Sequence, residues 1–125
     1  MITHQHTVGV KSDSSPALSA TVAEVGSAEF VVSQVIPASA VNQALPIALT
    51  AANVQSLILK SSTDLTIKAN STTAPDFTLN LKAGRPLVWR KSDGYFAGPI
   101  AANVTSLYLT NGAAATTFEG RILVS

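Results

Sequence analysis

The chain lacks cysteine and has few charged residues, and each shortage excludes a class of protein or site. With no cysteine among its 125 residues, it can form neither disulfides nor thiolate metal sites. Lys, Arg, Asp and Glu make up 12% of the chain, against about 25% in a typical soluble domain. The Lys and Arg residues are scattered, which argues against a nucleic-acid surface. A surface with so little charge is poorly protected against association, so we expect other chains to cover part of it.

Long apolar runs are also missing. No stretch approaches the roughly 20 apolar residues that a membrane-spanning helix needs. The opening MITHQHTVGV does not have the basic start and apolar run of a secretory signal. We therefore expect neither a membrane partner nor a signal peptide. A chain of this length fits one domain, and residues 1–125 are expected to form it.

What the sequence does contain is strict alternation of apolar and polar residues. In Asp64–Ala69, Leu65 and Ile67 fall on one face of an extended strand. Clusters rich in Ser, Thr, Asn, Asp, Gly and Pro separate the alternating runs and are typical of turns. The predicted strands are Gln5–Lys11, Leu18–Val25, Glu29–Ile36, Ala44–Leu49, Val54–Lys60, Asp64–Ala69, Phe77–Lys82, Leu87–Arg90, Ser106–Thr110 and Phe118–Val124.

Many short strands with turns between them predict an all-β fold. The expected architecture is a two-sheet antiparallel β-sandwich of the jelly-roll type, with its first two strands paired. No segment has a sustained helical stripe, although Val35–Ala44 could hold one short helical turn. The polar residues Met1–Thr7 suit a short extended N-terminal arm that adds to the sheet of a neighbour.

A stretch of twelve residues occurs twice. AANVQSLILKSS covers Ala51–Ser62 and AANVTSLYLTNG covers Ala101–Gly112, with identical residues at seven positions. In each copy two leucines lie two residues apart and therefore share one face of a strand. A solenoid needs at least three stacked repeats. The repeat therefore predicts two strands in comparable positions of facing or neighbouring sheets, rather than a pair of ligand sites.

Candidates for chemistry are few. His4 and His6 share a face of the first strand and could jointly approach a metal ion, but two imidazoles are too few for a tight site. The four aspartates fall at predicted turns, where aspartate commonly bonds its own backbone. The motifs of serine hydrolases, phosphate-binding loops and zinc proteases do not occur. We therefore predict no catalytic, cofactor or metal residues and a protein that is not an enzyme.

The aromatic residues gather in AGRPLVWRKSDGYFAGP. Trp89, Tyr95 and Phe96 stand there beside Arg85 and Arg90. Trp, Tyr and Arg are enriched at interface hot spots, but Trp89 could instead plug the core or the end of the sandwich, and an aromatic ring could stack on a sugar. The predicted interface residues are His4, His6, Arg85, Trp89, Arg90, Tyr95 and Phe96.

Two longer stretches carry a resemblance to a known class of proteins. The stretch NVQSLILKSSTDLTIKANSTTAPDFTLNLKAGRPLVWRKSDGY, followed by NVTSLYLTNGAAATTFEGRILV and preceded by the opening HQHTV, resembles small structural proteins of tailed-phage particles. It is most similar to capsid decoration, or cement, proteins. The resemblance lies in strands and turns, and no residue-level binding motif carries over. It implies a β-sandwich, often trimeric, that binds the outside of an expanded capsid and bridges neighbouring capsomers.

The resulting hypothesis is a non-enzymatic virion protein on the capsid exterior. Its expected partners are two further copies of itself, as a homotrimer, and the major capsid protein or other virion proteins. No cofactor, nucleic acid or membrane is expected. The alternatives are a tail-tip or fibre module of a phage particle, and a carbohydrate-binding β-sandwich module that uses Trp89 and Tyr95.

Overall fold

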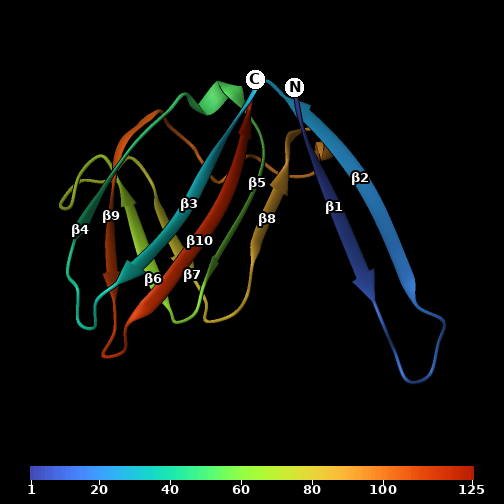
Figure 1. The fold of residues 1–125 in the computed structure, drawn as a ribbon, viewed down its shortest axis with the longest axis horizontal. Coiled ribbons are helices and arrows are strands. Elements are labelled where there is room, and N and C mark those ends of the chain that lie inside the picture. The colour runs from blue at the N-terminus through green and yellow to red at the C-terminus, as the bar shows by residue number, and fades with distance from the viewer.

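The computed structural model describes residues 1–125 and contains ten strands in three antiparallel sheets (Figure 1). Two short 3₁₀ helices, η1 (Ala51–Asn53) and η2 (Lys91–Asp93), precede β5 and follow β8. None of the helical segments has the length and apolar character to cross a membrane. The strands are β1 (Ile2–Val10), β2 (Leu18–Gly26), β3 (Ala28–Ile36), β4 (Gln43–Leu49), β5 (Val54–Ser61), β6 (Leu65–Ala69), β7 (Thr78–Leu81), β8 (Leu87–Arg90), β9 (Val104–Asn111) and β10 (Thr116–Val124).

The strands β3 to β10 form a jelly roll. One sheet has the order β3-β10-β5-β8 and the other has the order β4-β9-β6-β7. From β3 onward each strand lies in the opposite sheet from the one before it, except that β6 and β7 are neighbours in one sheet. Eight strands wound between two sheets in this way are the jelly-roll arrangement. The predicted two-sheet antiparallel sandwich is therefore confirmed.

A core of 16 buried apolar residues fills the space between the two sheets. The repeated stretch supplies a large share of it. Leu57 and Leu59 of β5 and Leu107 and Leu109 of β9 are all buried. β5 and β9 are both inner strands, one in each sheet. The prediction that the two copies occupy comparable strands of facing sheets is confirmed, and their shared function is to supply leucines to the core.

The third sheet is a hairpin of β1 and β2 that projects from the sandwich. It leaves the body beside the two chain termini, and its loop is the point farthest from the sandwich (Figure 1). Its nine register pairs run from Ile2↔Gly26 to Val10↔Leu18. The expected pairing of the first two strands is confirmed, and the first strand starts at Ile2. Residues 2–7 are extended, as expected of an arm, but they pair with β2 of the same chain. The projecting element is thus a two-stranded hairpin.

The segment Val35–Ala44 contains no helical turn. Ser39 and Asn42 adopt positive φ values of 57° and 51° instead, which is incompatible with a right-handed helical turn. Asn111 of β9 stabilises this connection, because its Oδ1 accepts a hydrogen bond from Ala40 N at 2.9 Å and its Nδ2 donates to Pro37 O at 2.9 Å. Side-chain bonds from a distant strand therefore hold the loop that the sequence suggested as a helical turn.

Candidate functional site

The best-built polar cluster lies where the base of the hairpin covers the outer face of the β3-β10-β5-β8 sheet. The register of β1 and β2 places the pairs Ile2↔Gly26, His4↔Glu24 and His6↔Val22 on one face of the hairpin. On the sheet, Leu123 and Ser56 stand opposite each other and are fully buried. A Cβ added to Gly26 would approach Leu123 Cγ to 2.7 Å. The hairpin backbone therefore rests directly on the sheet at this glycine.

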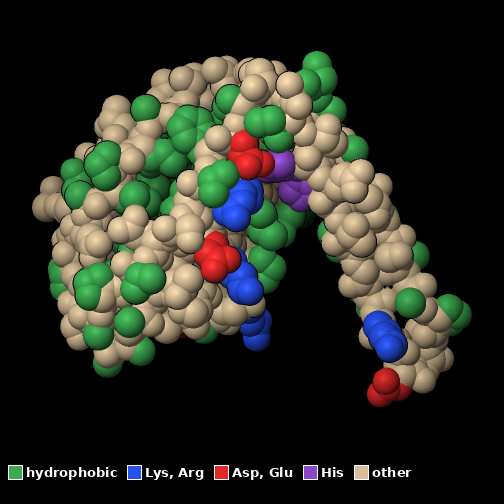
Figure 2. All heavy atoms as spheres, in the orientation of Figure 1, with side chains coloured by type: hydrophobic (Ala, Val, Ile, Leu, Met, Phe, Trp, Pro, Cys, Tyr) green, Lys and Arg blue, Asp and Glu red, His purple; other side chains and the backbone are tan.

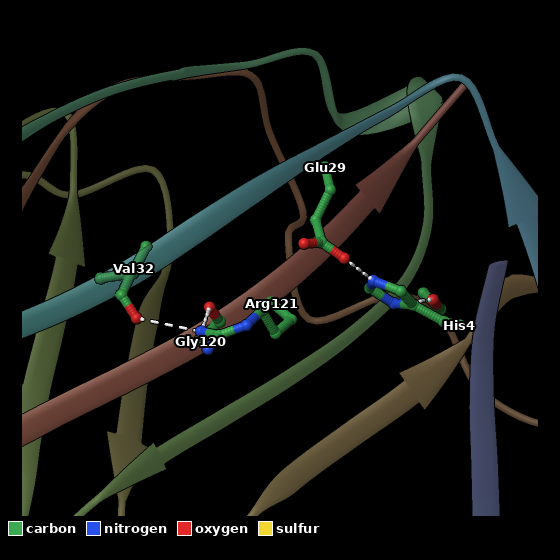
Figure 3. A network of polar contacts seen from close by, with 6 residues as sticks. His4, Glu29, Val32, Gly120 and Arg121 are labelled. Atoms are coloured by element: carbon green, nitrogen blue, oxygen red, sulfur yellow. Dashed lines mark hydrogen bonds and ion pairs between the residues drawn. The ribbon is translucent and has the colours of Figure 1, made fainter. Parts of the chain in front are cut away.

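His4 forms the central contact of the cluster. Its Nε2 donates to the Glu29 carboxylate on β3, and its Nδ1 lies 3.1 Å from the Ser56 hydroxyl on β5 (Figure 3). A carboxylate only accepts hydrogen bonds, so the Nε2 side of the ring carries the proton. On the neighbouring strand of the hairpin, Glu24 accepts a hydrogen bond from the Ser92 hydroxyl of η2. These contacts tie both strands of the hairpin to the sandwich.

His6 and Arg90 lie next to this contact. The His6 ring centroid is 5.9 Å from that of His4, with the ring planes tilted by 54°. Burial lowers the pKa of His6 below its ordinary value, and the positive charge of Arg90 acts in the same direction. Arg90 Nε donates to Asp93 at 2.8 Å. His6 Nε2 and Arg90 Nη1 are buried and have no hydrogen-bond partner in the protein.

Beyond its base the hairpin separates from the sheet and leaves an open cleft of about 460 Å³. The hollow between the body and the hairpin is visible in the space-filling view (Figure 2). Val8 and the polar residues of β1 line one wall, and Ile58, Val88 and Arg121 line the other. The base is thus a packed contact, whereas the outer half of the hairpin stands free.

Of the predicted interface residues, the structure brings His4, His6 and Arg90 together at the hairpin base. All three make their contacts within the chain. Trp89 lies on the opposite face of β8, half-buried against the core, where its Nε1 donates to Phe96 O at 3.1 Å. This placement agrees with the interpretation of Trp89 as a plug of the core. A Cβ on Gly98 would approach the Trp89 ring to 3.2 Å, so the small residue lets the following loop cross the indole closely.

The remaining three predicted residues are exposed and lie in loops. Tyr95 and Phe96 are 82% and 83% exposed, in the segment that follows η2. Arg85 is exposed in the turn before β8, at the opposite end of that strand from Arg90. Tyr95 and Phe96 are therefore available to a partner, but they do not form one surface with Arg85.

Sequence reasoning missed Glu24, Glu29, Ser56 and Ser92, which complete the cluster around His4. A signal for Glu24 was present, because a hairpin centred on the loop after Lys11 places His4 opposite Glu24. The other three residues come from β3, β5 and η2, and no local pattern brings those segments to the hairpin.

The cluster can fix the direction of the hairpin, and its His6 can respond to pH. Its side chains include no group of three or more His, Asp or Glu residues suited to hold a metal ion. Comparison of the chain with protein-family models, with curated proteins and with solved structures found no match.

Proposed function

We propose that this chain is a structural protein of a phage particle, which binds the outside of the capsid as a decoration protein and acts as a homotrimer. The observation that carries the proposal is a jelly roll from which an amphipathic hairpin projects, with the apolar face of its outer half uncovered. An apolar strand face in water is unfavourable unless a partner covers it. The proposed partner of this face is another copy of the chain in the homotrimer, and the sequence resemblance to capsid decoration proteins makes the capsid the proposed target of the whole oligomer.

A protein of this kind acts by binding rather than by bond chemistry. Several weak contacts on one oligomer act together, because the second and third binding events are effectively intramolecular. A ligand that binds only the assembled shell stabilises that shell by mass action. The low charge of the chain is suited to extensive contact with neighbours, because little charge has to be desolvated.

Tyr95 and Phe96 are the proposed contact with the capsid. Both are large, exposed and adjacent, and aromatic side chains are typical anchors of protein interfaces. The loop that carries them is held at its start by η2 and at Phe96 by the hydrogen bond from Trp89. The two rings are therefore presented from an ordered loop.

The test is co-sedimentation of the purified chain with expanded capsids of the phage that encodes it. We expect saturable binding and a capsid that withstands higher temperature when decorated. A Tyr95→Ser/Phe96→Ser variant should lose binding at an unchanged solution mass, whereas Val41→Ser, an exposed position elsewhere, should bind like the wild type. Failure of the wild type to bind would reject the proposal. Binding to soluble glycans through Tyr95 and Phe96 without capsid binding would replace it with a carbohydrate-binding function.

A further inference from the structure

The hairpin is amphipathic to its free end, but its own sandwich covers only its base. The pairs Val8↔Ala20 and Val10↔Leu18 continue the face that carries His4 and His6. Val10 is 66% exposed and Leu18 is 76% exposed. The opposite face of the same segment carries Thr7, Gly9, Ser19 and Thr21. We call Val8, Val10, Leu18 and Ala20 the distal apolar face.

A second uncovered apolar surface lies on the outer side of the β3-β10-β5-β8 sheet. The register aligns Val31, Arg121, Ile58 and Val88 in one row across the four strands, which we call the outer row. Its three apolar members are all exposed, Val31 to 59%. Arg121 Nη1 donates to Gly120 O at 2.8 Å, so the charged end of the side chain is folded back onto the backbone (Figure 3). The row therefore presents mainly hydrocarbon.

Each of the two surfaces has one basic and one acidic residue near it. The hairpin loop carries one basic and one acidic residue, Lys11 and Asp13, and both kinds of charge are visible at the free end of the hairpin (Figure 2). On the sheet, Glu119 and Lys60 face each other two residues beyond the outer row. Because each pair contains both signs, only one orientation of a contact between the two surfaces would place opposite charges together at its edge, and that orientation would be favoured.

The two surfaces lie on the same molecule but are held apart within it. Contacts of His4 with Glu29 and of Glu24 with Ser92 fix the base, and the cleft of about 460 Å³ separates the outer half of the hairpin from the sheet. In a pair of copies, the distal apolar face of one copy can cover the outer row of the other. Such a head-to-tail contact closes into a ring when its rotation allows.

We infer that the distal apolar face of one copy packs on the outer row of a second copy. The inference rests on the self-association in the proposed function, and it names the residues that join the copies. It is independent of the capsid contact, which involves the loop of Tyr95 and Phe96. The exposed valines and leucine of the hairpin are, in this arrangement, the buried centre of a subunit interface.

Disulfide crosslinking tests the contact cleanly, because the chain has no cysteine of its own. A mixture of the single variants Leu18→Cys and Ile58→Cys should give a covalent dimer under mild oxidation. The double variant Leu18→Cys/Ile58→Cys should give dimers and larger species. We expect about tenfold more product than from Ser19→Cys mixed with Ile58→Cys, since a formed contact raises the effective concentration of the thiols. Ser19 is the matched control, because it neighbours Leu18 on the opposite face.

Three results would overturn the inference. A double variant that crosslinks only within one chain would show that the hairpin closes on its own sheet. Dimers of Leu18→Cys alone, at the yield of the mixture, would show that two hairpins meet face to face. A yield no higher than that of the Ser19 control would show that the surfaces do not meet. In this last case a trimeric wild type would retain the proposed homotrimer, and a monomeric wild type would reject the homotrimer as well.

Discussion

The sandwich and the hairpin are built from strands of the same kind but differ in what covers them. β10 and β1 each have nine residues, and in both the alternate positions of one face include apolar residues, namely Phe118 and Ile122 in β10 and Ile2, Val8 and Val10 beside the two histidines of β1. In β10 those residues face a second sheet and are buried, whereas in β1 burial ends after His6. Alternation of apolar and polar residues therefore predicts which face of a strand is apolar and favours burial. Whether the cover comes from the same chain or from another one is decided by the tertiary fold.

The largest expected difference between the two regions is the loss of stability caused by a leucine-to-alanine substitution. Leu109 is fully buried between the sheets, and Leu18 is 76% exposed on the hairpin. Leu109→Ala should lower the free energy of unfolding by about 3–5 kcal/mol, because it removes buried methyl groups and leaves a cavity. Leu18→Ala should change it by less than about 0.5 kcal/mol. Urea denaturation at low protein concentration measures both, and equal losses would contradict the division into core and free arm.

The next largest effect is expected from a substitution at the contact between the hairpin and the sandwich. A Cβ at Gly26 would lie 2.6 Å from Val124 O and 2.7 Å from Leu123 Cγ. Gly26→Ala should therefore push the hairpin off the sheet at a cost of about 1–3 kcal/mol. Hydrogen exchange should accelerate in β1 and β2 while the sandwich stays protected. Gly112→Ala is the matched control, because a Cβ there meets nothing within 4 Å. Unchanged exchange in Gly26→Ala would mean that this glycine does not seat the hairpin.

Removing the central polar contact should have a smaller effect. His4→Ala loses the hydrogen bonds to Glu29 and Ser56, and we expect the hairpin to lose about 1–2 kcal/mol of local stability. Limited proteolysis in the loop 11–17 should then extend into β1. The loss of stability in the double variant His4→Ala/Glu29→Ala should be smaller than the sum of the losses in the two single variants, because the two residues are partners. Additive losses would contradict a direct interaction.

The smallest expected effect is a dependence on pH. Burial first, and then Arg90 and His4, lower the pKa of His6 below 6.5, while Glu24 and Asp93 oppose the shift. The folded state therefore favours neutral His6. This contribution to stability is complete above pH 6.5 and declines as the pH falls from 6.5 towards the lowered pKa. The protection factors of β1 and β2, which are corrected for the intrinsic pH dependence of amide exchange, should fall over that window, and His6→Phe should remove the His6 part of the change. An identical pH profile in His6→Phe would assign it to other groups.

The elements of the fold were predictable, because each strand carries its own alternation. Leu65 and Ile67 already mark the inner face of β6, and the two leucine pairs of the repeat mark the inner strands β5 and β9. The order of the strands within the sheets was less accessible. The register that places Val31, Arg121, Ile58 and Val88 in one row joins residues that are far apart in sequence, and short segments contain no information about such pairings.

The candidate site was predictable only in part. His4, His6 and Arg90 stood out because the chain has few charged residues and only two histidines, and the structure brings the three together. Their partners Glu29 and Ser56 lie in strands whose sequences read as ordinary sandwich strands. Trp89 shows the reverse case, since its residue type allowed either an interface or a place in the core, and only its position on the inner face of β8 shows that it packs against the core.

The solution mass of two proteins tests the central claim most directly, namely that the free half of the hairpin joins copies of the chain. We expect the wild type to sediment as an oligomer of the 12.9 kDa chain, and the variant Val10→Glu/Leu18→Glu to sediment as a monomer with unchanged stability of the sandwich. A wild type that stays monomeric at every concentration, or a variant with the mass of the wild-type oligomer, would contradict the account.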